Sequence, residues 1–164
     1  MSKQYSQFDV VGSLLSNDRI LVGRVDGASP SGFSNFLIER VDLIPNAIRV
    51  VGAVFDGGGG LPTVPTIVYI RCPFDGVIDR WDIIGDDVGD AVIDVWKAAG
   101  SIPTIADTIT GTEKPTLTGQ QLNSDDALTT WNDAVLEGDI IGFVLVSVAT
   151  CKRIVCELQV LQPL

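Results

Sequence analysis

The sequence contains no histidine among its 164 residues. This absence removes Ser-His-Asp and Cys-His catalysis, histidine metal ligands, and the side chain that most often acts as a general base near neutral pH. Catalysis by carboxylate, lysine or cysteine side chains is still open, and a hydrolase with paired carboxylates stays as an alternative. The composition favours a protein that is not an enzyme, with no catalytic residues, no cofactor and no metal.

Long apolar runs are also missing. The longest run, from Ile140 to Ala149, is interrupted by Gly142 and Ser147, whereas a membrane helix needs ~20 apolar residues. Residues 1–9 lack the apolar segment of a secretory signal peptide. The sequence therefore predicts a soluble chain that does not enter a membrane.

Positive charge is scarce. The chain has 11 Lys and Arg residues against 21 Asp and Glu residues, which gives a net charge of −10. Such a surface repels phosphate backbones and anionic lipid, so we expect neither nucleic acid nor membrane as a partner. Charged residues make up only 20% of the chain and apolar residues 46%. That balance fits either a strand-rich core or an apolar surface that is buried between subunits.

The three cysteines, Cys72, Cys151 and Cys156, show no Cys-x-x-Cys spacing. Cys151 and Cys156 would face opposite sides of a continuous strand, because their separation is odd, and could not form a local disulfide there. We predict buried free thiols, which suits assembly in a reducing cytoplasm.

From residue 47 onward, short apolar segments alternate with turns rich in Gly, Pro and Asp. The predicted strands are Ile48–Phe55, Thr66–Cys72, Val77–Ile84, Ala91–Lys97, Ile140–Val148 and Arg153–Leu161. We expect turns at Asp56–Gly60, Pro73–Gly76 and Gly85–Gly89, and a long polar connection over Gly100–Gln121. This spacing predicts an all-β fold, a jelly-roll-like antiparallel β-sandwich over residues 47–164.

Residues 1–46 contain too little apolar material for a core of their own. They include a possible strand, Ile20–Asp26, and an aromatic and aliphatic segment, Phe33–Ile38. We interpret 1–46 as an extended N-terminal arm for anchoring, with extra strands of the sandwich as the alternative. The candidate partner-binding residues are Phe33, Phe36, Leu37 and Ile38. Such a cluster is suited to an apolar groove on a partner, or to its own domain.

Two further clusters suggest ligands. The acidic cluster Asp86, Asp87 and Asp90 could bind calcium, although it lacks EF-hand spacing and is also typical of a solvated turn. The three tryptophans could form a platform for sugar rings, but their apolar surroundings favour packing in the core or between subunits. They are Trp81, Trp96 and Trp131.

Four phrases occur in a distinctive order: Asp94–Lys97, Pro103–Pro115, Trp131, and Gly138–Asp139. Together they resemble a β-sandwich module of tailed-bacteriophage virion structural proteins, of the capsid-decoration or fibre-tip type. The similarity extends from Thr66 to Leu161. Members of this family form virion surface domains, many of them trimers, and no catalytic residues come with the resemblance.

The resemblance implies a non-enzymatic virion structural protein, assembled in the host cytoplasm and placed on the virion surface. The leading expectation is a trimeric capsid decoration protein that binds the major capsid protein or another virion protein and stabilises the shell. The alternative is a receptor-binding tip of a tail fibre or head fibre that recognises host surface carbohydrate. A sugar-active enzyme is a third interpretation, which would require a pair of essential carboxylates.

Overall fold

The computed structural model describes Arg19–Val25, Phe33–Glu39 and residues 47–162. Two compact units divide the chain, Met1–Pro45 with Leu164, and Asn46–Pro163. In the first unit, β1 (Arg19–Val25) and β2 (Phe33–Glu39) pair as an antiparallel hairpin in continuous register. Whether this unit serves as an anchoring arm stays a prediction.

The second unit consists of seven strands and one short 3₁₀ turn. The strands are β3 (Ala47–Asp56), β4 (Thr66–Arg71), β5 (Gly76–Ala99), β6 (Thr116–Asp125), β7 (Ala134–Val135), β8 (Asp139–Ala149) and β9 (Arg153–Gln162), and the turn is η1 (Ile105–Asp107). Every strand pair in this unit is antiparallel. The predicted all-β antiparallel fold is therefore confirmed, while a jelly-roll connectivity stays a prediction.

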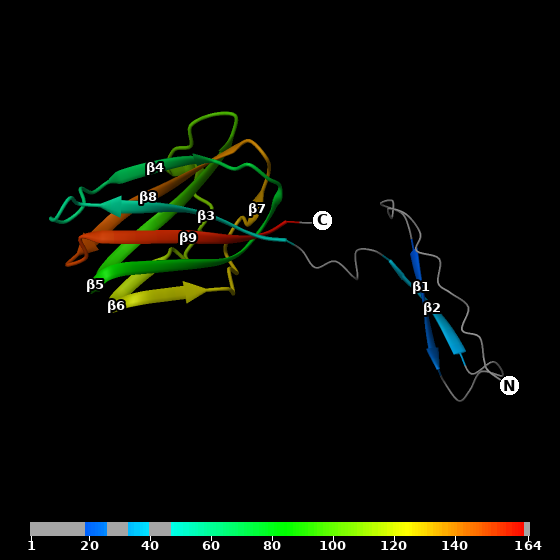
Figure 1. Ribbon diagram of the computed structural model, residues 1–164. Helices are drawn as coiled ribbons and strands as arrows, with labels where there is room; N and C mark the ends of the chain where they lie inside the picture. The colour runs from blue at the N-terminus through cyan, green and yellow to red at the C-terminus, as the bar shows by residue number, and fades with distance from the viewer. Residues whose placement is uncertain (1–18, 26–32, 40–46, 163–164) are drawn as a thin grey trace. The chain divides into compact units, whose positions relative to one another are not determined.

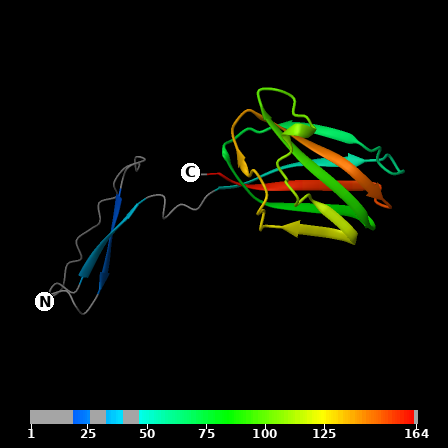
Figure 2. The same cartoon turned by 180° about the vertical axis from the view of Figure 1, so that it is seen from behind.

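The seven strands form one curled sheet in the order β3-β9-β5-β8-β4, with β6 and β7 also paired to β5. Residues Val77–Gly85 of β5 pair with β9, and residues Asp90–Ala99 pair with β8. The first half-sheet is therefore β3, β9 and the start of β5, and the second is the end of β5, β8 and β4. Figures 1 and 2 show β5 following β9 and then turning across the fold beside β8.

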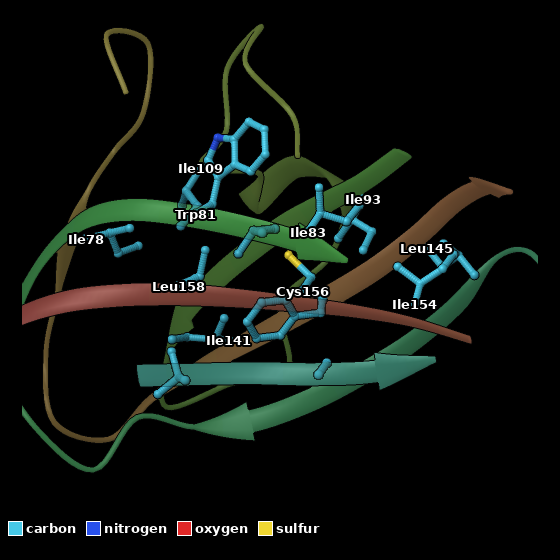
Figure 3. Close-up of a cluster of buried hydrophobic side chains, with 14 of the residues drawn as sticks. Ile78, Trp81, Ile83, Ile93, Ile109, Ile141, Leu145, Ile154, Cys156 and Leu158 are labelled. Carbon is cyan, nitrogen blue, oxygen red and sulfur yellow. The ribbon is translucent and has the colours of Figure 1, made fainter. Parts of the chain in front are cut away.

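The core lies between the two half-sheets, because alternate residues of each strand point inward. In the first half-sheet, Ile83 of β5 and Cys156 of β9 are opposite one another and fully buried. In the second, Ile93 of β5 and Leu145 of β8 form the corresponding pair. Figure 3 shows these side chains converging on one apolar layer.

The predicted boundaries fail most clearly in β5. The prediction of two strands separated by a turn at Gly85–Gly89 is wrong, because β5 is continuous from Gly76 to Ala99. Val77, which alternation placed on one face with Trp81, is instead 45% exposed while Ile78 is buried. A register shift between Ile78 and Arg80 explains the reversal, since one extra residue in a strand moves every earlier side chain to the other face.

The long connection predicted over Gly100–Gln121 is shorter than expected. Its last part belongs to β6 (Thr116–Asp125), which pairs with β5 on both sides of the corner. Only Leu117 of this strand is deeply buried. A strand with one inward apolar anchor carries no alternating pattern, so the sequence did not reveal it.

The β5 corner, Gly85–Gly89, packs against the turn between β8 and β9. Cys151 Sγ donates to the carbonyl of Asp87 at 3.2 Å, and Thr150 Oγ1 donates to the carbonyl of Val88 at 2.8 Å. A Cβ on Gly89 would lie 2.4 Å from the Ala149 carbonyl oxygen. Glycine is required there because backbone atoms of the turn occupy the space of a side chain.

We predict that Gly89→Ala lowers the free energy of unfolding by about 2–3 kcal/mol, because the added methyl group must displace the β8–β9 turn. The matched control is Gly60→Ala, whose new Cβ would have only the Gly57 carbonyl oxygen nearby, at 3.8 Å. Urea unfolding of both variants measures the effect. Equal midpoints for Gly89→Ala and the control would show that the corner tolerates a side chain.

Candidate functional site

The most concentrated group of polar side chains surrounds Asp94, on the outward side of β5. Asp94 is only 3% exposed, and its carboxylate accepts three hydrogen bonds. Thr108 Oγ1 and Thr110 Oγ1 donate to Oδ1 at 2.6 and 2.9 Å, and Lys114 Nζ donates to Oδ2 at 2.8 Å. All three donors come from the segment after η1, so Asp94 fastens that segment along β5.

Asp94 stays ionised among these donors because its pKa is lowered. Burial by itself would raise the pKa of Asp94, but the Lys114 ammonium and the hydroxyls of Thr108 and Thr110 outweigh burial and hold that pKa below its ordinary value of 3.8. An ionised carboxylate has no proton to give, and donors already occupy three of its roughly four lone-pair positions. The arrangement suits a structural anchor.

Glu113 makes a second fastening on the same segment. Its carboxylate accepts hydrogen bonds from the amide of Thr130 at 2.7 Å and from the hydroxyls of Thr129 and Thr130. These bonds lower the pKa of Glu113. The indole of Trp131 donates to the Glu113 carbonyl at 2.9 Å. The chain before β7 is thereby tied to the chain before β6.

The other residues of the four resembling phrases also have structural tasks. The Asp107 carboxylate accepts from the amide and the hydroxyl of Thr104, which closes η1. Gly111 has φ +54°, and a Cβ there would lie 2.6 Å from the Thr130 carbonyl oxygen. Asp139 accepts from the amide of Leu136 at 3.0 Å. These residues of the pattern therefore hold loops in place.

The sequence alone did not identify this group. Asp94 is the one polar residue in the apolar segment Ala91–Trp96, but its partners lie between 14 and 20 residues further along the chain. The sequence does contain a signal for such a cluster, namely an aspartate inside an apolar segment, followed by several threonines and a lysine. A carboxylate that is buried with its strand needs hydrogen-bond donors nearby.

The acidic cluster does not converge on a common point. Asp86 Oδ1 accepts from the amide of Lys152, Asp87 Oδ1 from the amide of Val88, and Asp90 Oδ1 from the amide of Gly119. Among the residues that the structure describes, no group of three or more acidic or cysteine side chains could hold a metal ion. The cluster therefore shapes the β5 corner and the turns around it.

The tryptophans and cysteines are mostly core residues. Trp81 is 4% and Trp131 8% exposed, while Trp96 lies half-buried on the outward side of β5, so the three do not form a platform. The three cysteines are all buried and free, as predicted. Burial raises the pKa of both Cys72 and Cys156, which keeps these thiols protonated and unreactive.

Two shallow depressions share Arg71 at the end of the second half-sheet. One has a volume of about 360 Å³ and is also lined by Ile102, Gly138 and Ile140. The other is about 210 Å³ and lies beside Cys72, Pro73 and Glu137. Neither combines a buried polar group with an enclosed apolar wall, the combination typical of small-molecule sites.

The candidate partner-binding residues of the first unit lie on β2. In the hairpin register Phe33 is opposite Val25, Phe36 opposite Val22, Leu37 opposite Leu21 and Ile38 opposite Ile20. Their side chains lie outside what the structure describes, so their role in partner binding stays a prediction.

The sequence matches no protein-family model, and no curated protein matches it significantly. Within the part of the chain that the structure describes, no helix has the length and apolar character needed to cross a membrane.

We predict that Asp94→Ala destabilises the second unit by about 2–4 kcal/mol at neutral pH, because Lys114 and the buried Thr110 lose their shared acceptor. Asp94→Asn, which keeps an oxygen acceptor and loses the charge, should cost about half as much. Chemical unfolding followed by tryptophan fluorescence measures both losses. If both variants are as stable as the original chain, the hydrogen bonds of Asp94 do not stabilise the fold.

The Asp94 anchor also predicts a pH dependence. The pKa of Asp94 is lower in the folded chain than its ordinary 3.8, so the stabilisation is complete above that value and disappears as pH falls through the folded pKa. The stability difference between the original chain and Asp94→Asn should therefore be constant near neutral pH and shrink in acid. Unfolding curves for both chains over an acid pH series give this difference. A difference that does not change with pH would contradict the ion pair.

Proposed function

We propose that this chain is a non-enzymatic structural protein of a tailed-bacteriophage virion, acting as a trimeric capsid decoration protein. It would lie on the virion surface, bind the major capsid protein and stabilise the shell. The observation that carries the proposal is that residues of the phage-like sequence pattern hold a loop in place. Asp94, Asp107, Gly111 and Lys114 all hold one loop in place, as expected for the signature of a surface module that supplies shape and no chemistry.

Other features agree with this role. The described depressions at Arg71 are shallow, and the Asp94 carboxylate is already occupied by three donors. The net charge of −10 would complement basic patches on a shell. In a trimer, three linked first units would bind a shell far more tightly than one, because the second and third contacts form within a single complex.

One observation favours the second candidate, a carbohydrate-binding fibre tip. Tyr69 of β4 and Trp96 of β5 are both register partners of Gly142 on β8, so they flank it on the outward side of the second half-sheet. Tyr69 is 42% exposed, and aromatic faces bind sugar rings. However, a Cβ on Gly142 would contact both the Tyr69 ring and Pro103, so these two side chains already pack over the glycine.

We predict that Leu37→Asp in the full chain abolishes binding to shells assembled without this protein. The substitution would bury a charge in the apolar contact that we propose between the hairpin and the shell. Asn35→Asp is the matched control on the same strand and should bind as the original chain does. Co-sedimentation with the shells measures binding. If the original chain itself does not sediment with shells, the decoration role is wrong.

Counting copies separates the two candidates. Quantitative mass spectrometry of purified virions should find hundreds of copies for a shell protein. A few copies per particle would instead favour the fibre-tip or tail-tip role.

A further inference from the structure

Two rows of apolar side chains cross the outward face of the first half-sheet. Row A consists of Val54, Val155, Ile84 and Leu122, which are register neighbours on β3, β9, β5 and β6. Row D consists of Ile48, Leu161, Val77 and Ala134, which are register neighbours on β3, β9, β5 and β7. Leu122 and Ile48 are each 61% exposed. Exposed apolar groups in such continuous rows mark an interaction surface.

Two rows with polar groups lie between the apolar ones. Row B consists of Gly52, Glu157, Asp82 and Ser124, and row C consists of Val50, Gln159 and Arg80. Arg80 binds Asp82 within the chain, with its closest N–O distance 2.7 Å. Glu157 takes part in no ion pair among the described residues. The four rows together are called the outer face.

The outer face carries charges of both signs. Row C contains Arg80, and row B contains Asp82 and Glu157. The two middle rows are therefore of opposite charge, which suits a contact between copies in which row B meets row C. The Asp56–Arg153 ion pair, at 2.7 Å, lies on β3 and β9 just beyond row A and supplies a polar border.

We propose that the outer face binds a second copy of this chain, with row A of one copy against row D of the next and row B against row C. The inference adopts the trimer of the proposed function and rests on it for the number of copies. It names the surface through which the copies meet.

The order of the rows follows from symmetry and charge. A rotation axis that runs in front of the face, parallel to the rows, places row A of one copy over row D of the next, whether two or three copies surround it. The same rotation lays each strand over its own copy, so Arg80 of one copy lies opposite Asp82 of the next, with Glu157 on the neighbouring strand β9. An axis parallel to the strands would instead place row B on row B, and its carboxylates would repel each other.

The first test is the mass of the full chain in solution, by sedimentation equilibrium across the micromolar range. We expect the original chain at three times 17.5 kDa and Leu122→Glu at the monomer mass, because a carboxylate in row A would be buried among apolar groups. Leu136→Glu is the matched control, since Leu136 is also 61% exposed but lies outside the outer face. It should keep the mass of the original chain.

Circular dichroism and thermal unfolding of both variants confirm that the fold is retained. If the original chain is a monomer throughout the micromolar range, the proposal is wrong, and the outer face would have to bind a different protein. An unchanged mass for Leu122→Glu would overturn it too, because the copies would then meet elsewhere.

The second test, Glu157→Arg, separates the two row orders. With row B against row C, the new arginine lies opposite Gln159 of the next copy and diagonal to its Arg80, and the repulsion between the two arginines should raise the dissociation constant about tenfold. With row B against row B, the same change would remove repulsion and tighten association. Within one chain the new arginine is opposite Asp82, so the fold itself should not be weakened.

Failure of this inference is distinguishable from failure of the proposed function. A trimer that dissociates on Leu122→Glu but does not bind shells would support the outer face and contradict decoration. A chain that binds shells and keeps the trimer mass after Leu122→Glu would support decoration and contradict the outer face.

Discussion

The fold depends on the close approach between the β5 corner and the turn that joins β8 to β9. Strand β5 belongs to both half-sheets, so the core can close only if β5 turns sharply between Gly85 and Gly89. Backbone and sulfur atoms of the β8–β9 turn fill the space on the inner side of that corner, which leaves no room for a side chain at Gly89. Two glycines and one turn thereby fix the angle at which the half-sheets face each other.

The Asp94 anchor depends on that angle in turn. It lies in the part of β5 that follows the corner, on the side away from the core, and it would be exposed if the segment around Thr108–Lys114 did not cover it. The cost of burying a carboxylate is offset by an ammonium and two hydroxyls. The polar side chains around Asp94 and Glu113 thus hold loops, and exposed apolar side chains lie on the faces of the sheet. This arrangement is why we propose a role in assembly.

The sequence was a reliable guide wherever a strand alternates between core and solvent. Strands β3 and β8 extend one residue beyond their predicted bounds at each end, and β9 extends one residue beyond at its end only. All three cysteines are buried and free as expected. It failed where long-range contacts decide the outcome. Gly85–Gly89 has the composition of a turn, yet the β8–β9 turn holds it as a strand corner. The partners of Asp94 and the rows of the outer face depend on register, which local composition does not encode.

We infer that the exposed apolar side chains of the outer face form a contact between copies. Thiol cross-linking tests it directly, because the native cysteines are buried and do not compete. Val54→Cys and Ile48→Cys place one reactive thiol in row A or row D of β3. With a short bis-maleimide, a mixture of the two variants should cross-link strongly and each variant alone should not. Cross-linking of each variant to itself, or of neither in the mixture, would contradict the account.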